Sequence, residues 1–146
     1  MIGFGDNYPL AHFARAQLIK IKPDIRMIPI GGFSVPEEFA SITSMDSVLA
    51  LSFGRRSSTL RSILQSARLA GVDTVSLTDQ VSSGFPNLAK VTLRCRTQGL
   101  SYFDSVAAPV SVITHLCATV AKQIGQNAVE RLRYIESIHS DWGGAN

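Results

Sequence analysis

The sequence predicts an α/β domain, a three-layer sandwich in which helices cover both faces of a five-stranded parallel sheet. Three observations predict it. Short apolar runs alternate with longer segments of helical periodicity. The runs are too apolar to face water, as is typical of strands buried on both sides. The 146 residues suffice for one domain, residues 1–146, and no repeat or linker divides them.

Five segments are expected to be strands. The clearest is Ser47–Ser52, a continuous apolar run. The run at 25–30 contains Pro29, which lacks an amide donor and therefore belongs at a strand end or an edge. The first strand is only Met1-Ile2, so we expect it to be the truncated end of a longer one. The five expected strands are 1–2, 25–30, 47–52, 74–78 and 91–94.

Helices are expected between and after these strands. Ser57 is a typical N-cap for a helix that Gly71 ends, and its apolar residues recur on one side. Ser34 and Glu37 have the spacing of a capping box, which predicts another helix start. The remaining helices are expected from Pro9 to about 22, at 105–124 and at 128–140, with a frayed tail at 141–146.

Composition excludes several classes of protein. A hydrophobic fraction of 45% with 17% charged residues excludes a disordered chain. Cys95 and Cys117 form no disulfide scaffold or CxxC motif, and the three histidines lack metal-ligand spacing. We therefore expect no metal and no cofactor. The net charge of +3 suits an anionic small ligand but is too small to indicate a nucleic-acid surface.

Residues 106–124 are long and apolar enough to be weighed as a membrane span. Pro109, His115 and Lys122 interrupt the segment, so we expect a buried core or dimer-interface helix and no membrane partner. His115 is accordingly expected to be a core or interface histidine without a catalytic role. The N-terminus lacks the features of a signal peptide, which predicts a cytoplasmic location.

Candidate ligand-binding residues lie in loops at the carboxyl ends of strands, where such sheets bind ligands. The loop 3–9 brings backbone amides to a helix N-terminus, although a simple tight turn explains it equally well. The loop after residue 52 adds hydroxyls and two guanidinium groups, Arg55 and Arg56. Cations are unfavourable at a helix N-terminus, so these two favour an anionic ligand; the alternative is solvated surface charge beside a plain N-cap. Asp79, in a third loop, is expected to shape a turn through its own backbone.

These three loops together resemble the sugar isomerase (SIS) domain family over essentially the whole chain. The family motifs are G-x-G-x-S with a small residue after it, S-x-S-G-x-T, and T-D followed by S-P-L-A. The chain departs from them at several positions: Asn7 replaces a serine, Gly54 a serine and Arg55 a glycine. The slots of P-L-A hold Gly84, Phe85 and Pro86. The matching positions are Gly3, Gly5, Ala11, Ser52, Ser57 (for threonine), Thr78, Asp79 and Ser83.

The C-terminal third is similar to the SIS domains of RpiR-type transcriptional regulators, on the residues Phe103-Asp104-Ser105, the apolar helix after them, and Arg131-Leu132 with Ile135-Glu136. The resemblance implies a flavodoxin-like fold and a phosphosugar-sensing role in a homodimer or higher homo-oligomer. It also implies DNA binding through an N-terminal helix-turn-helix domain absent from these residues. The ligand contacts it implies are Asn7, Ser52, Ser57 and Ser83, to which electrostatics adds Arg55 and Arg56.

Two alternatives stay open beside this sensor. An aldose–ketose phosphosugar isomerase would need an acid–base pair, and none stands at a motif position, so no enzyme is expected. The replacements at Gly54 and Arg55 favour the second alternative, a module that has lost its ligand and only dimerises. The sequence predicts neither the sugar nor the regulated genes.

Overall fold

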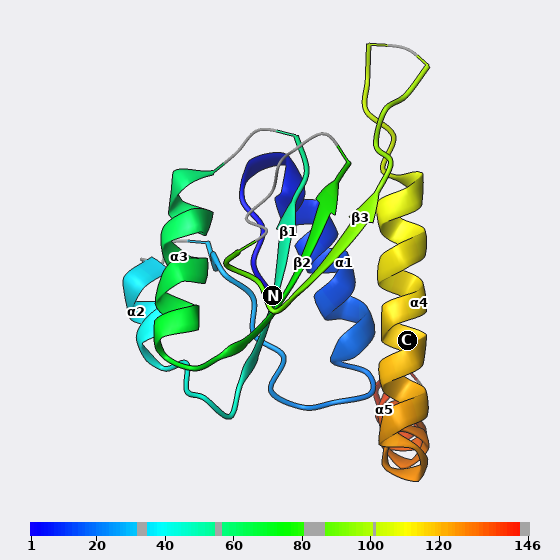
Figure 1. Ribbon diagram of the computed structural model, residues 1–146. Coiled ribbons are helices and arrows are strands. Elements are labelled where there is room, and N and C mark those ends of the chain that lie inside the picture. Colours follow the sequence, from blue (N-terminus) through cyan, green and yellow to red (C-terminus); the bar gives the residue numbers. More distant parts are fainter. Residues whose placement is uncertain (32–34, 55–56, 81–86, 101, 144–146) are drawn as a thin grey trace.

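The computed structural model describes residues 1–31, 35–54, 57–80, 87–100 and 102–143 (Figure 1). Its centre is a parallel sheet in the order β1-β2-β3, formed by Ser47–Ser52, Asp73–Asp79 and Val91–Cys95. The register pairs Leu51 with Leu77, and Leu77 with Leu93. Three of the five expected strands are present, and β2 and β3 are longer than expected by two residues and one residue.

The other two expected strands are reduced to isolated bridges, so the described sheet has three strands where five were predicted. Ile2 bridges both Ala50 and Ile28 in parallel. Its carbonyl accepts from the Leu51 amide at 2.8 Å, and the Ile28 amide donates to the Met1 carbonyl at 2.7 Å. The chain at 25–30 fails to continue as a strand because Pro29 has no amide to donate. In space, the segment at Ile28 lies beside the segment at Ile2, which lies beside β1, followed by β2 and β3. This is nevertheless the order of segments in a doubly wound sheet.

The described residues form five helices, with a short 3-10 turn, η1 (Gly5–Asn7), before the first. They are α1 (Tyr8–Leu18), α2 (Val35–Ala40), α3 (Ser58–Leu69), α4 (Ala107–Ile124) and α5 (Gln126–Gly143). The α3 prediction is confirmed at both ends, because Ser57 Oγ accepts from the Leu60 amide at 3.2 Å and Gly71 has φ +72°. Ser34 of the expected capping box lies outside the described residues. The expected frayed tail is wrong for 141–143, which continue α5.

Side-chain alternation along β1 divides the core into two layers. Leu49 and Leu51 face α1 and α4, where they join a cluster that includes Leu77 of β2. Val48 and Ala50 point to the opposite face and pack against α3, with α2 residues at the margin. This period-two alternation of a strand buried on both sides explains the uninterrupted apolar run in the sequence.

Helix α4 turns its apolar residues toward the body of the protein. Ile113 and Cys117 are buried, and Val110, Leu116 and Val120 pack against the cluster under α1. His115 lies on the exposed side of α4, so it is not a core histidine of this domain, and the alternative of an interface histidine stays a prediction. The polar residues of the segment thus form a solvated helix face. Within the described residues, no helix meets the length and hydropathy required to cross a membrane.

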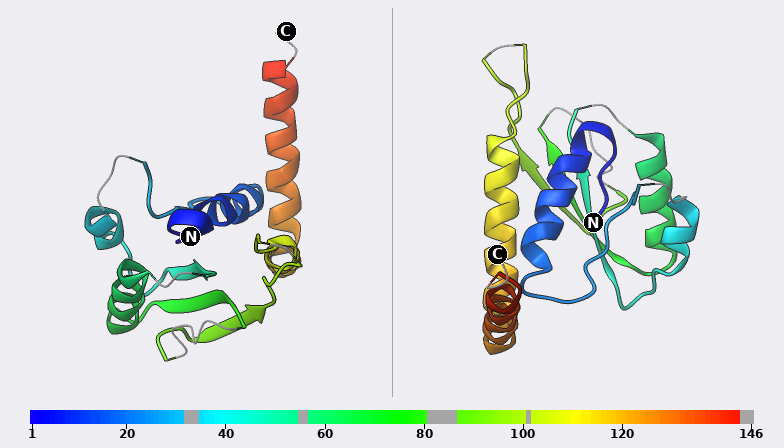
Figure 2. Two further views of the ribbon diagram at one scale, coloured as in Figure 1. Left: turned by 90° about the horizontal axis from the view of Figure 1, so that it is seen from above. Right: turned by 180° about the vertical axis from the view of Figure 1, so that it is seen from behind.

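Helix α5 extends away from the rest of the molecule (Figure 2). Ala128 is buried at its base, and Arg131 Nε donates to the Ile19 carbonyl at 3.0 Å. Beyond this point α5 exposes several large apolar side chains. They are Val129, Leu132, Tyr134 and Trp142.

Candidate functional site

Asn7 connects the first loop to the loop after β1. Its side-chain Oδ1 accepts from the Phe53 amide at 2.9 Å, and its Nδ2 donates to the Phe53 carbonyl at 3.2 Å. Asn7 is 8% exposed, so this two-point contact lies under the surface. Because both ends of the side-chain amide are engaged, Asn7 fixes the Phe53 backbone at the carboxyl edge of the sheet.

Asp79 makes a second connection across the same edge. The residue ends β2 and is 6% exposed, and its Oδ2 accepts from the Gly54 amide at 2.8 Å. One residue earlier, Thr78 Oγ1 donates to the Ser52 carbonyl at 2.8 Å. The expectation that Asp79 shapes its own turn missed this contact, in which the carboxylate holds the neighbouring loop. Pattern reasoning had no signal for it, since the two residues are 25 positions apart.

The start of α3 lies at this edge, with Ser57 as its cap (Figure 1). The Ser57 hydroxyl accepts from the Leu60 amide, while the amides of Ser58 and Thr59 have no acceptor within the described residues. Ser52, at the end of β1, is 5% exposed. A helix N-terminus presents unpaired N–H groups and a positive dipole end, so it attracts an anion.

The structure therefore brings three of the six predicted site residues to one edge: Asn7, Ser52 and Ser57. The other three, Arg55, Arg56 and Ser83, lie outside the described residues. Two residues that sequence reasoning did not select as ligand contacts, Gly54 and Asp79, also belong to this edge. Within the described part of the chain, no three His, Cys, Asp or Glu side chains are grouped as metal ligands would be.

The carboxylate of Asp79 also influences a residue of the neighbouring strand. Asp79 is paired in register with Cys95 of β3. Burial raises the pKa of the Cys95 thiol, and the carboxylate of Asp79 raises it further. The carboxyl edge thus combines an anion-attracting helix start with a buried anion of the protein itself.

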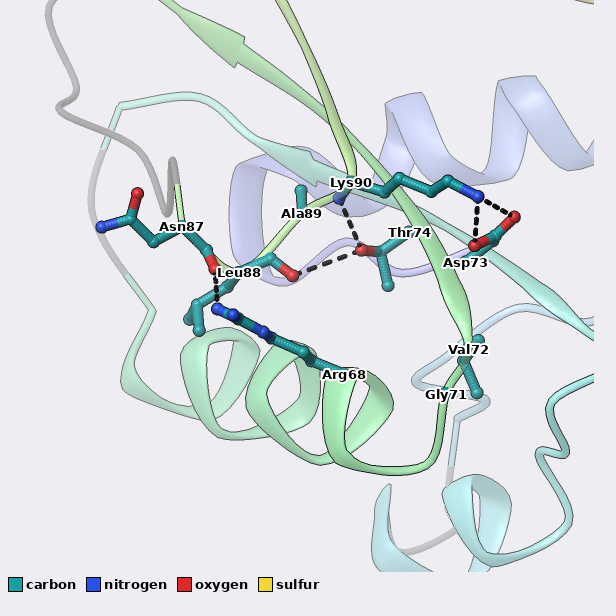
Figure 3. A pocket seen from close by; sticks show the side chains of 9 residues that line it. All are labelled: Arg68, Gly71, Val72, Asp73, Thr74, Asn87, Leu88, Ala89 and Lys90. Atoms are coloured by element: carbon teal, nitrogen blue, oxygen red, sulfur yellow. Dashed lines mark hydrogen bonds and ion pairs between the residues drawn. The ribbon is translucent and has the colours of Figure 1, made fainter.

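A separate hollow of about 550 Å³ lies at the opposite, amino end of the sheet (Figure 3). Lys90 Nζ forms an ion pair with Asp73 at 2.8 Å, and Arg68 donates to the Asn87 carbonyl. Thr74 Oγ1 accepts from the Lys90 amide at 3.1 Å and donates to the Leu88 carbonyl at 3.3 Å. The charged groups of this hollow are paired with other groups that line it. The hollow is therefore a weaker candidate for a ligand site than the carboxyl edge.

The fold defines a class, the doubly wound α/β domains, in which small ligands generally bind at the carboxyl edge of the sheet, where the strand order reverses. A family model of the SIS domain matches residues 1–121. The chain belongs to the SIS domain family. No curated protein matches the chain.

The solved structures that are similar to the chain include the following three. The sugar isomerase domain of an RpiR transcription factor from Sphaerobacter thermophilus has a TM-score of 0.83 at 24% identity, over 93% of this chain and 76% of that one. Vibrio vulnificus NanR, in complex with ManNAc-6P, gives 0.72 at 16% identity, over 97% and 54%. A hypothetical protein from Methanococcus jannaschii, for which 3-hexulose-6-phosphate isomerase function was inferred, gives 0.64 at 10% identity, over 89% and 73%.

These structures share the fold with this chain, and their low identities carry no residue roles to it. The chain spans about half of the NanR chain, so NanR contains a large part that has no counterpart here. The family match confirms the predicted α/β fold of the SIS type, while the described sheet has three strands where five were predicted.

Proposed function

We propose that this domain is the phosphosugar-binding sensor of an RpiR-type transcriptional regulator. The observation that carries the proposal is the convergence of Asn7, Ser52 and the Ser57-capped start of α3 at one edge of the sheet. The two regulator structures of the same fold support it, one of them bound to a sugar phosphate. DNA binding would belong to a separate helix-turn-helix domain in the same polypeptide.

The amides of Ser58 and Thr59 are the first contacts proposed for the ligand phosphate. They lie at the N-terminus of a helix of 12 residues, where the backbone dipole favours an anion. The hydroxyls of Ser52 and Ser57 would donate to the phosphate or the sugar. Arg55, Arg56 and Ser83 are proposed as further contacts from the sequence alone.

The proposed regulator is a homodimer or a higher homo-oligomer in the cytoplasm. The apolar helix at 106–124 was expected to be a core or dimer-interface helix, and α4 packs its apolar residues against the body of the domain. The exposed apolar side chains of Leu132 and Trp142 make α5 the better candidate for a contact between subunits. Ligand binding would regulate DNA binding by favouring one arrangement of the subunits over another.

A thermal-shift panel followed by calorimetry tests the proposal. The panel contains glucose 6-phosphate, fructose 6-phosphate, ribose 5-phosphate and ManNAc-6P, each matched by the same sugar without phosphate. At least one phosphorylated member should raise the melting temperature at millimolar concentration, since a ligand that binds only the folded state stabilises it. The unphosphorylated partner should have a smaller effect. A folded protein that no member stabilises would contradict the proposal and favour the module that only dimerises.

An aldose–ketose phosphosugar isomerase is the second candidate. It is favoured by the similarity to the Methanococcus jannaschii structure, for which a hexulose-phosphate isomerase function was inferred. A coupled assay with hexose and pentose phosphates separates the two candidates. The sensor proposal expects binding without turnover, whereas measurable turnover that an edge substitution abolishes would replace it.

A further inference from the structure

A second hollow, the Met1 hollow, has a volume of about 410 Å³ and lies beside the amino half of β1. Most of the residues that line it are apolar. They include Leu18 of α1, Val48 and Leu49 of β1, and Leu116 and Val120 of α4. Apolar walls hold water poorly, because a water molecule in a cavity needs polar partners. The Met1 hollow therefore suits apolar side chains.

Backbone pairing along β1 stops at the Met1 hollow. The Ile2 amide donates to the Leu49 carbonyl at 2.9 Å, and the Leu51 amide donates to the Ile2 carbonyl at 2.8 Å. The N–H and C=O groups of one strand residue point to the same side, so the Leu49 amide points away from β2 and toward the hollow. Leu49 is buried, and no acceptor for its amide is found among the described residues. A buried amide without an acceptor is destabilising, so a carbonyl in the hollow would be favoured.

The Met1 nitrogen occupies the position of a strand amide at the wall of this hollow. It donates to the Arg26 carbonyl at 2.6 Å, and the Met1 carbonyl accepts from the Ile28 amide at 2.7 Å, as in a parallel ladder. Burial lowers the pKa of the Met1 ammonium from its ordinary value of 8.0 to about 6, and the charges of Arg15 and Arg26 lower it further. The position therefore suits a neutral amide better than a charged amine.

We infer that the Met1 hollow binds an extended polypeptide segment that is joined to the Met1 nitrogen and continues the Met1-Ile2 strand along β1. The carbonyl of its last residue accepts from the Leu49 amide. Because Ile2 pairs with Ala50, two residues before Met1 reach the level of Ser47, where β1 begins. Side chains alternate along a strand, so one of the two lies on the side of Met1 and the other on the side of Ile2. Both sides belong to apolar clusters, so both residues should be apolar.

This segment gives the proposed regulator a defined connection between its two domains. In that regulator the segment is the end of the polypeptide that arrives from the helix-turn-helix domain, and this part of the inference rests on the proposed function. The connection then enters the sheet as a strand, so the DNA-binding domain is attached to the amino edge of the sheet by a paired segment. The proposed sugar phosphate binds at the opposite, carboxyl edge.

The test adds four residues, Ser-Thr-Val-Val, in front of Met1. The matched control adds Ser-Gly-Ser-Gly, which forms the same amide at the Met1 nitrogen but brings no apolar side chain. The Val-Val extension should melt roughly 5 °C or more above this control, because it buries two valine side chains. Its Leu49 amide should also exchange hydrogen at least about tenfold more slowly than the same amide in residues 1–146, since it gains a buried acceptor.

Equal melting temperatures of the two extended proteins, or a lower one for the Val-Val extension, would overturn the inference. The sugar-phosphate panel is run on the same proteins to separate it from the proposed function. If a sugar phosphate binds but the Val-Val extension does not stabilise, the inference is wrong and the proposed function stands. If the Val-Val extension stabilises but no sugar phosphate binds, the Met1 hollow is a strand site and the proposed function is wrong.

A measurement on residues 1–146 does not depend on whether the extended proteins fold. Hydrogen exchange followed by nuclear magnetic resonance compares two amides of β1 that point to the same side. The Leu49 amide should exchange at least about tenfold faster than the Leu51 amide, which donates to the Ile2 carbonyl. Equal exchange rates would show that the Leu49 amide already has a partner, and would overturn the inference.

Discussion

Replacing Asn7 with alanine should destabilise the domain by about 2–3 kcal/mol. The substitution removes two hydrogen bonds, Phe53 N–H to Oδ1 at 2.9 Å and Nδ2 to the Phe53 carbonyl at 3.2 Å. Each loss leaves a backbone group without its partner, which costs roughly 1–2 kcal/mol where water is excluded. Phe53 is half-buried, so water recovers part of the total. For a chain of this length the change corresponds to a melting temperature lower by roughly 4–12 °C.

Urea denaturation followed by circular dichroism measures the difference. Asn87→Ala is the matched control, because Asn87 is exposed and its side chain points away from the neighbouring hollow (Figure 3). Its free energy of unfolding should stay within about 0.5 kcal/mol of wild type. If Asn7→Ala is as stable as this control, Asn7 does not hold the Phe53 backbone in solution.

Three further predictions concern stability. Gly3→Ala should be destabilising in thermal melts, because its Cβ would lie 2.6 Å from the Asn7 carbonyl oxygen and 2.9 Å from Ala11 Cβ; an unchanged melting temperature would contradict the close packing. Ser76→Ala should raise the free energy of unfolding, by about 1 kcal/mol, since Ser76 Oγ is buried without a hydrogen-bond partner among the residues that the structure describes; a loss of stability would reveal a partner. Hydrogen bonds from the Thr43 amide and hydroxyl lower the pKa of Asp46, so it contributes stability above its ordinary value of 3.8 that disappears as the pH falls below it. Between pH 6 and 2, the free energy of unfolding should therefore fall less for Asp46→Asn than for wild type. Identical pH profiles of the two proteins would refute this.

Sequence patterns of a few neighbouring residues were sufficient to predict the strand and the helix ends that depend only on those residues. The strand β1 was predicted to the residue because an apolar run flanked by polar residues leaves little choice. The N-cap of α3 and its glycine stop were predicted because side-chain capping and positive φ depend on one or two residues. The strand expected at 25–30 is reduced to a bridge at Ile28, because Pro29 has no amide to continue the pairing.

The sequence predicted where the candidate site lies in the fold, but not the contacts that organise it. Asn7 and Ser57 were selected from a loop pattern and a family motif, and the structure brings them to one edge. The contacts that organise this edge join residues far apart in sequence, 46 positions for Asn7 and Phe53 and 25 for Asp79 and Gly54. No local propensity encodes such pairs. Which side of α4 faces the core likewise depends on the elements it packs against, so the sequence did not show that His115 lies outside the core.

Helix α5 has a consequence for local stability. Its base is fixed by Ala128 and Arg131, but most of its 18 residues make few contacts with the rest of the domain. A helix of this length without tertiary contacts is only marginally stable in water. The distal turns of α5 should therefore unfold and refold independently of the sheet, and exchange their amide hydrogens many times faster than β1. Any protein surface that binds Trp142 would slow this exchange, which makes α5 an internal reporter of association.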